Sequence, residues 1–435
     1  MNTLTSSSIA SEQRFMELED LDRQVSWHPF TQMAEWTPLV IASGDGCFLV
    51  DHRGQRYLDG VSSLWCNVHG HRHPALDEAL RTQLGRIAHT TYLGLTHEPG
   101  IRLAAEILEV APNNLSRVFF SDSGSTAVEI ALKQSFQYWQ LVGRPAKQRF
   151  VRVGDAYHGD TLGAVGVGGI DLFHRVFGPL LVHSIAIPSP SLESALSELE
   201  RVLSQRHDEI AAFVVEPLIQ GAAGMLVHQP GFLARARELC SRFDVHLIVD
   251  EVATGFGRTG AMFACEREAV QPDFLCLAKG ISGGYLPLAA TLTTEQVYRA
   301  FLGARSDLRH FFHGHTYTAN PLACAVGRAS LALLRTSTLP HARRMVPLFD
   351  AALGRLARTQ HVRQVRSRGL MGGIELAARD GRSMGAEVCE RARDHGVMLR
   401  PLGDVVVWMP PLVISQSELE LLERATAQAI EDCFT

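Results

Sequence analysis

Residues 272–284 read PDFLCLAKGISGG, an apolar run that ends in a lysine and three glycines. The run from Phe274 to Ala278 predicts a short buried strand with Lys279 at its carboxyl end. Lysine is seldom fully buried without a partner. By itself the pattern fits a strand-end lysine whose stem packs while its ammonium reaches water. The alternative is an amine with a lowered pKa in a desolvated pocket, where it can form a Schiff base.

Short apolar runs of the same kind alternate with amphipathic stretches between about residues 100 and 320. Four of them read SRVFFSDSG, RFVRVGDAYHG, IAAFVVEP and VHLIVDE, and each ends in polar or glycine residues. A helix is predicted over 125–140, where apolar residues recur every three or four positions. These residues are Val128, Leu132, Phe136 and Trp139. The alternation predicts an α/β fold with a mostly parallel sheet, in which ligands bind beyond the carboxyl ends of the strands.

The pattern of apolar residues changes twice along the chain, which divides it into three predicted segments. Residues 71–320 are predicted to form a large domain around the sheet. Residues 321–435 carry long amphipathic helices and two strand-rich stretches, which predict a smaller α+β domain. Residues 1–70 contain a hairpin-rich stretch at 39–60 and are predicted to join that smaller domain.

Composition narrows the class of protein. The 435 residues are 46% apolar and carry a net charge of −5, which argues against nucleic acid as a partner. No apolar run approaches the roughly 20 residues of a membrane span, and the N-terminal stretch lacks the features of a secretory signal. The eight cysteines form no CxxC pair. A cytoplasmic protein with reduced thiols and no membrane association is therefore expected.

Two strand ends carry groups that fit one cofactor. Asp250 ends the run VHLIVD, where a carboxylate needs a partner. Alone it fits a helix cap or an ion pair, but beside Lys279 it also fits the carboxylate that keeps a pyridine nitrogen protonated. Gly124 and Ser125 open a helix directly after a strand, which makes either an ordinary capped turn or a phosphate site. Tyr157 is a packed loop residue or an aromatic face for a planar ring. Together these parts match a pyridoxal 5′-phosphate (PLP) site.

Several longer stretches then resemble a known family. DEVATGFGRTG (250–260) and CLAKGISGGYLPLAA after it are similar to the signature region of the class III aminotransferases. WHPFTQM, SSLWCNVHGHRHP, YHGDTLGAV, FFHGHTYTANPLAC and LRPLGD resemble the branch of that family that aminates 8-amino-7-oxononanoate in biotin biosynthesis. The likeness runs from about Trp27 to Pro411. It implies PLP fold type I, with a small domain built from the N- and C-terminal segments, and a homodimer with shared active sites.

The resemblance also implies roles for the cofactor residues. Lys279 would bind the PLP aldehyde covalently, and Asp250 would hold its pyridine nitrogen. Gly124 and Ser125 would bind the phosphate, and Tyr157 would stack near the ring and act in catalysis.

Other residues gain roles from the resemblance alone. Gly314, His315 and Thr316 would reach across the dimer interface, and Thr316 would complete the phosphate site of the neighbouring subunit. Arg400 would bind the substrate carboxylate, a task that suits a planar guanidinium, although an ordinary surface ion pair is the alternative. The substrate pocket would further include Phe30, Leu64 and Trp65.

The amino donor stays open between S-adenosylmethionine and L-lysine. The form of the family that uses S-adenosylmethionine has a tryptophan pair where this chain has Leu64-Trp65 and tyrosines where it has Phe30 and Val407. Each departure removes an aromatic face or a hydroxyl from the expected pocket, and such a change shifts substrate preference. Several stretches look more like the lysine-using form.

Three other functions are compatible with part of this pattern. A class III transaminase for ω-amino acids or diamines would share the cofactor site but not the stretches around Phe30, Leu64 and Arg400. A PLP aminomutase would need no external donor. A non-catalytic scaffold would not need Lys279 and Asp250 together.

Two histidine groups invite a metal interpretation: His69, His71 and His73, and His313 with His315. Alternating residues on a strand share one face, but cysteine or acidic ligands do not accompany them at suitable spacing. No metal site is predicted. Glu216, at the end of IAAFVVEP, is compatible with a substrate contact and with a cap or ion pair.

Overall fold

The computed structural model describes residues 6–182 and 184–434, and the side chains of all of these except residues 6–15. Its largest element is a seven-stranded sheet with the order β4-β12-β11-β10-β7-β5-β6. The strands are β4 (Leu115–Ser121), β5 (Arg149–Val153), β6 (Ile185–Ile187), β7 (Ile210–Val215), β10 (His246–Asp250), β11 (Phe274–Leu277) and β12 (Ala289–Thr294). Strands β6, β5, β7, β10 and β11 pair in parallel, whereas β12 is antiparallel to β11 and β4. The predicted mostly parallel α/β sheet is confirmed.

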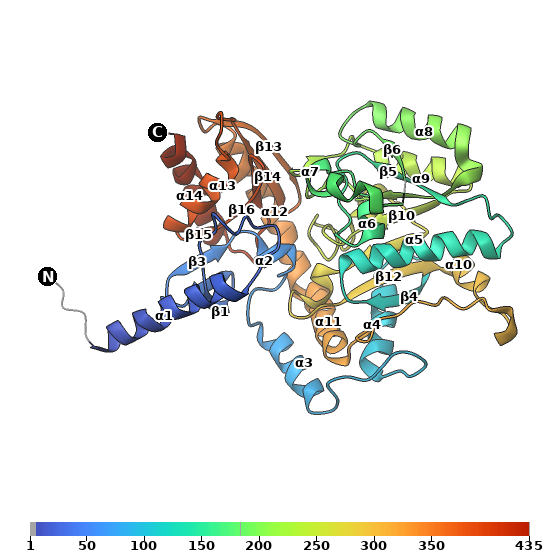
Figure 1. The fold of residues 1–435 in the computed structure, drawn as a ribbon, viewed down its shortest axis with the longest axis horizontal. Coiled ribbons are helices and arrows are strands. Elements are labelled where there is room, and N and C mark those ends of the chain that lie inside the picture. The colour runs from blue at the N-terminus through green and yellow to red at the C-terminus, as the bar shows by residue number, and fades with distance from the viewer. Residues whose placement is uncertain (1–5, 183, 435) are drawn as a thin grey trace.

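Both faces of this sheet are buried beneath helices (Figure 1). In β10, Ile248 packs in the same cluster as the apolar face of α5 (Gly124–Leu141). Its neighbours Leu247 and Val249 point to the opposite face, where they join the cluster of α8 (Ser194–Arg206) and α9 (Phe232–Arg242). Successive side chains of a strand alternate between the faces, so a strand covered on both sides is apolar throughout. This explains why the sequence shows continuous apolar runs.

The helix predicted at 125–140 is α5, and three of the four apolar residues that recur along it are buried. Val128, Leu132 and Trp139 are buried, whereas 39% of Phe136 is exposed. Each step of four residues turns the helix by about 40° beyond a full circle. Two such steps from Val128 carry Phe136 to the edge of the buried face, while the step of three to Trp139 turns back toward it.

A smaller domain lies on the left in Figure 1 and contains two four-stranded sheets. One sheet comprises β1 (Ile41–Asp45), β2 (Phe48–Asp51), β3 (Arg56–Asp59) and β15 (Val397–Met398). The other comprises β13 (Val362–Arg368), β14 (Met371–Leu376), β17 (Val405–Trp408) and β16 (Arg400–Leu402). Strand β15 pairs in parallel with β3, so that Val397 lies opposite Leu58. The N- and C-terminal segments therefore build this domain together, as expected, while its boundaries at residues 70 and 320 stay a prediction.

Four long helices belong to the C-terminal segment: α11 (Pro321–Leu333), α12 (Leu339–Leu356), α13 (Met384–Asp394) and α14 (Gln416–Phe434). The remaining α-helices and strands are α1 (Ser6–Val25), α2 (Ser62–Trp65), α3 (Pro74–Leu84), α4 (Glu98–Leu108), α6 (Leu162–Gly166), α7 (Asp171–His174), α10 (Glu295–Ala300), β8 (Ile219–Gln220) and β9 (Leu226–Val227). Among the described residues, none of the helices combines the length and apolarity that crossing a bilayer requires.

Candidate active site

Residues at the carboxyl ends of β4, β5, β7, β10 and β11 surround a cavity of about 570 Å³. That volume suits a small cofactor together with a substrate. The predicted site residues in its lining are Leu64, Trp65, Gly124, Ser125, Tyr157, Asp250 and Lys279. The lining does not include the remaining predicted residues, which are Phe30, Gly314, His315, Thr316 and Arg400. The parallel sheet thus gathers groups that lie far apart in the chain at one edge.

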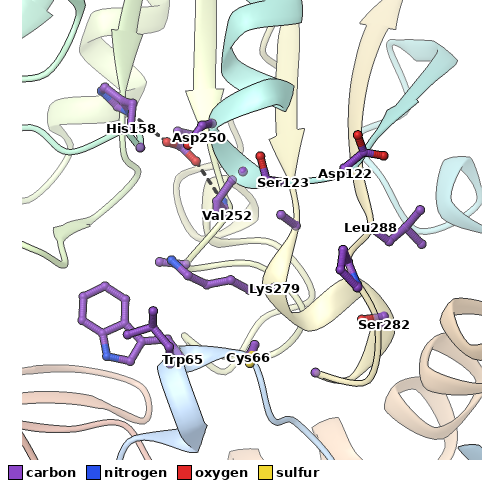
Figure 2. A pocket seen from close by; sticks show the side chains of 18 of the residues that line it. Trp65, Cys66, Asp122, Ser123, His158, Asp250, Val252, Lys279, Ser282 and Leu288 are labelled. Carbon is purple, nitrogen blue, oxygen red and sulfur yellow. Dashed lines mark hydrogen bonds and ion pairs between the residues drawn. The ribbon is translucent and has the colours of Figure 1, made fainter. Parts of the chain in front are cut away.

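Lys279 projects into this cavity between Asp250 and Trp65 (Figure 2). Its Nζ lies 4.9 Å from the centroid of the Trp65 ring and makes no hydrogen bond within the described residues. Burial lowers the pKa of Lys279, although the nearby Asp250 and Glu216 oppose this effect. The backbone of Lys279 is left-handed (φ 42°), a conformation that costs a residue with a side chain about 1–3 kcal/mol. A partly buried, unpaired amine in a strained turn is arranged for reaction rather than for stability.

Asp250 is fixed at the end of β10, opposite the side on which Lys279 enters. Its Oδ2 accepts a hydrogen bond from Nδ1 of His158 at 2.7 Å, and its Oδ1 accepts one from the backbone N–H of Val252 at 2.9 Å. Both contacts are drawn in Figure 2. Only 4% of Asp250 is exposed. Sequence reasoning missed His158, because nothing in the pattern YHG distinguishes it from a packed histidine.

The N-terminus of α5 lies at the cavity wall, where some of its backbone N–H groups have no partner within the helix. Ser123 caps the helix by accepting a hydrogen bond from the backbone N–H of Thr126. The backbone N–H groups of Gly124 and Ser125 precede the first helical hydrogen bonds and remain available to an anion. Gly124 is required there, since a Cβ atom would lie 2.6 Å from Cγ1 of Val252. The close packing of Val252 thus requires a glycine at the first position of the predicted phosphate site.

Tyr157 and Glu216 both line the cavity and are connected by a hydrogen bond. The Tyr157 hydroxyl donates to Oδ2 of Asp160 at 2.7 Å, and the Tyr157 backbone N–H donates to Oε1 of Glu216 at 3.2 Å. Glu216 is buried, and burial raises its pKa to about 7. These two hydrogen bonds hold the Tyr157 ring at the cavity. Glu216 contributes by accepting from the backbone N–H of Tyr157.

Arg400 lies at the start of β16, in the smaller domain. Its Cζ is 6.0 Å from the centroid of the Phe30 ring, and it is near enough to Tyr157 for their charges to interact. Burial lowers the pKa of Arg400. No carboxylate pairs with its partly buried guanidinium among the described residues, so the expected alternative of a surface ion pair does not apply.

An aromatic rim connects the two domains beside Arg400. The Phe173 ring lies 5.5 Å from that of Phe30 and 6.3 Å from that of Tyr157, both in edge-to-face geometry. The sequence pattern around Phe173 carries no signal for this role. Val407, in contrast, is fully buried in the cluster that contains Trp65, and it does not line the cavity. The expectation that a valine in place of tyrosine at position 407 removes a hydroxyl from the substrate pocket stays a prediction.

The segment 314–316 takes part in the site only indirectly within one chain. His315 Nδ1 lies 2.7 Å from Oδ2 of Asp122, a residue of the cavity wall, whereas Gly314 and Thr316 are exposed. The proposed contact of Thr316 with a second subunit stays a prediction.

The histidine groups have ordinary partners. In His69, Nδ1 lies 2.8 Å from the Thr338 hydroxyl and Nε2 lies 3.0 Å from the Ser330 hydroxyl. His71 Nε2 lies 2.9 Å from Oδ2 of Asp59. The part of the chain that the structure describes contains no group of three or more His, Cys, Asp or Glu side chains arranged to bind a metal ion.

The proteins that this chain resembles in sequence and in structure are aminotransferases. Proteins named adenosylmethionine-8-amino-7-oxononanoate aminotransferase are 49% identical in Geobacter sulfurreducens (95% of this chain, 97% of the relative) and 50% identical in Nitratidesulfovibrio vulgaris (96% and 82%). The crystal structure of the enzyme with that name from Methanocaldococcus jannaschii superimposes with a TM-score of 0.94 at 40% identity, covering 96% of this chain and 99% of the other. A PLP-bound amine transaminase from an uncultivated Pseudomonas species gives a TM-score of 0.89 at 33% identity, with 94% and 99% coverage. The family described as aminotransferase class III matches residues 31–430, a range that contains every residue of the cavity, and this chain belongs to that family.

Proposed function

We propose that this enzyme transfers an amino group to 8-amino-7-oxononanoate, which yields 7,8-diaminononanoate for biotin biosynthesis, and that it uses PLP as the cofactor. The observation that carries the proposal is the unpaired Lys279 amine in one cavity with Asp250. The names of the relatives at 43–50% identity supply the substrate.

The residues present fit PLP. Gly124 and Ser125 offer backbone N–H groups to a phosphate, and the lack of a Cβ atom at Gly124 lets the helix start pack closely against Val252. Asp250 supplies the buried carboxylate that a protonated pyridine nitrogen needs, and Tyr157 supplies an aromatic face. Lys279 supplies the amine for the aldehyde. When bound, PLP supplies an electron sink for the reacting carbon.

The chain's own residues then account for proton transfer and orientation. Because burial lowers the pKa of Lys279, a larger fraction of its Nζ is neutral near neutral pH than in an exposed lysine. A neutral Nζ can take a proton from the donor carbon and later return it. Asp250 keeps the opposite side of the site negative, while Trp65 covers the amine and limits access of water. Arg400 orients the substrate by its carboxylate.

Replacement of Arg400 by leucine is expected to raise the KM for 8-amino-7-oxononanoate about 10- to 100-fold, because a charge-assisted pair contributes about 1.5–3 kcal/mol. Arg400→Lys should recover only part of this, since an ammonium lacks the bidentate geometry. Steady-state kinetics at fixed donor concentration measure both. An amino ketone of equal length without a carboxylate is the control substrate, and wild type and variant should turn it over alike. An unchanged KM for the natural substrate in Arg400→Leu would exclude this role.

S-adenosylmethionine is the donor that we propose, because the relatives that share most of this sequence carry it in their names. The purified enzyme should form 7,8-diaminononanoate at least about tenfold faster with S-adenosylmethionine than with equimolar L-lysine. Mass spectrometry of the product after a fixed time measures this. A reaction without donor is the control, since an aminomutase would still convert its substrate. A higher rate with L-lysine would reverse the assignment.

We further infer a homodimer in which Thr316 of one subunit contributes to the phosphate site of the other. Thr316 is exposed in the single chain, in agreement with a contact outside it. Lys279→Ala and Thr316→Asp variants should each be inactive, whereas subunits mixed in equal amounts should recover about a quarter of wild-type activity, because half of the dimers then contain one intact site. Activity of the mixture equal to the sum of the separate variants would contradict shared sites.

A further inference from the structure

Residues 310–316 form an arm with two different faces. Its odd-numbered residues from Phe311 to His315 are partly buried, whereas its even-numbered residues from Phe312 to Thr316 are exposed. One face of the arm is therefore docked on its own chain. The face that includes Thr316 points away from that chain.

The docked face of the arm lies on β4 and α5, the two elements that meet at the predicted phosphate site. The Phe311 ring lies 5.3 Å from that of Phe119 in β4, in edge-to-face geometry, and the His313 ring lies 6.3 Å from it. In α5, the Gln137 side chain donates a hydrogen bond to the carbonyl oxygen of His310 at 3.0 Å. The arm is thus held by the strand and the helix whose ends border the cavity.

A histidine–aspartate hydrogen bond fixes the tip of the arm. His315 Nδ1 lies 2.7 Å from Oδ2 of Asp122, the residue that follows β4 and lines the cavity. An ionised carboxylate can only accept a hydrogen bond, so Nδ1 is the donor. The His315 ring is therefore turned to its own chain rather than outward with Thr316.

A turn follows directly after Thr316. The His315 backbone N–H donates to the Thr318 hydroxyl at 3.0 Å, and the Thr318 backbone N–H donates to the His315 carbonyl oxygen at 3.2 Å. Thr318 is buried, so this turn is anchored in the same chain. The backbone of Thr316 is thus held on both sides, while the residue itself stays exposed.

This arrangement gives the arm a place in both sites of a two-fold dimer. Each arm that reaches the neighbouring subunit is matched there by one that reaches back. The docked face of the arm then belongs to one phosphate site, and Thr316 belongs to the other. A segment that is ordered before its ligand binds lowers the entropy cost of binding. The bond between His315 and Asp122 supplies this order.

We propose that His315 is a positioning residue, which donates from Nδ1 to Asp122 and so holds Thr316 at the phosphate site of the neighbouring subunit. This role rests on the proposed PLP site and on the proposed homodimer. It predicts that loss of His315 weakens PLP binding in the neighbouring subunit and leaves the site of its own subunit intact.

Hybrid dimers separate the two sites. One subunit carries Lys279→Ala, so that only the other subunit attaches PLP covalently, and a different affinity tag on each subunit allows purification of the hybrid alone. His315→Ala is placed either in the Lys279→Ala subunit, whose arm serves the intact site, or in the subunit with the intact Lys279. Titration with PLP, followed by visible absorbance, measures the affinity of the intact site. Values of kcat and KM are recorded beside it.

The two placements should differ. In the Lys279→Ala subunit, His315→Ala is expected to weaken PLP binding about tenfold, because a hydrogen bond to the charged phosphate is lost with the position of Thr316. Beside the intact Lys279, the same change should alter the affinity by less than about twofold. The KM values at saturating PLP should stay within about threefold of those of the unmodified hybrid, since His315 does not line the cavity.

Amide variants and a matched histidine complete the test. Asparagine places its N–H near the position of Nδ1, so His315→Asn should restore most of the affinity, whereas His315→Gln places its N–H farther out and should restore less. His395 is the control, because its Nε2 lies 2.8 Å from Oδ2 of Asp432 outside the cavity, and this pair is about as exposed as His315 and Asp122. Its replacement by alanine should not change PLP binding.

Two results would overturn the role of His315. One is the same PLP affinity for both placements of His315→Ala. The other, which serves if the alanine variant does not fold, is equal behaviour of the asparagine and glutamine variants. Thr316→Asp in the Lys279→Ala subunit tests the shared site separately. Unmodified affinity with Thr316→Asp would overturn the proposed dimer arrangement, whereas weak binding with Thr316→Asp and unmodified binding with His315→Ala would overturn only the role of His315.

Discussion

Lys279→Ala is expected to lower turnover by at least about 10⁴-fold, since one side chain supplies both the covalent attachment and the proton transfer. The same variant should lose the visible absorbance that marks PLP attached to the protein. Substrate-dependent formation of 7,8-diaminononanoate and the spectrum after gel filtration measure the two effects. A variant that retains activity within tenfold of the wild type would refute the assignment.

The small number of lysines makes the attachment site easy to identify. The chain contains three, Lys133, Lys147 and Lys279. Borohydride reduction of the PLP-loaded enzyme, followed by peptide mass spectrometry, should find the label on Lys279 alone. Lys133→Gln is the matched control, since Lys133 is exposed, and it should retain both activity and spectrum. Lys147 is not a suitable control, because its side chain is buried and donates hydrogen bonds to three backbone carbonyls, so that its replacement would affect folding. A label on Lys133 or Lys147 would exclude the proposed mechanism.

Asp250→Asn is expected to have the second largest effect, with kcat reduced about 10²- to 10³-fold. An amide has nearly the shape of the carboxylate but cannot favour a protonated pyridine nitrogen by charge, so the electron sink becomes weak. Single-turnover measurements with S-adenosylmethionine alone isolate this step from the second half of the reaction. The spectrum of bound PLP should change in the same variant.

Glu251→Gln is the control for the loss of a buried carboxylate beside this position. Glu251 accepts hydrogen bonds from Thr254, Ala264 and Cys265, all away from the cavity, so its replacement should lower the melting temperature. The spectrum of bound PLP should not change. Wild-type single-turnover rates in Asp250→Asn would show that the carboxylate is not the partner of the cofactor.

Most of the large domain could be predicted from the sequence because its signals are local. Five apolar runs predicted β4, β5, β7, β10 and β11, and all of them form strands of the central sheet. Since the carboxyl ends of parallel strands meet at one edge, the polar residues that follow them could be assigned to one site without any distance. Burial within the apolar spacing of α5 could not be predicted residue by residue, since Phe136 lies beyond the arc that the helix buries. That Val407 is buried beside Trp65 could not be read from the resemblance, because a likeness between sequences does not say which side chains reach a surface.

The sequence by itself determined the family of the enzyme, the sheet and the identity of the groups at its edge, since strand periodicity and residue type are written into the chain. Only the tertiary structure decided which of these groups meet. His158 and Asp250 are 92 residues apart, yet Nδ1 of one lies 2.7 Å from Oδ2 of the other. The Nζ of Lys279 likewise lies 4.9 Å from the ring centroid of Trp65, a residue of the N-terminal segment. Periodicity reports the burial of each element separately. The contacts between elements depend on the order and register of the strands, which local patterns do not contain.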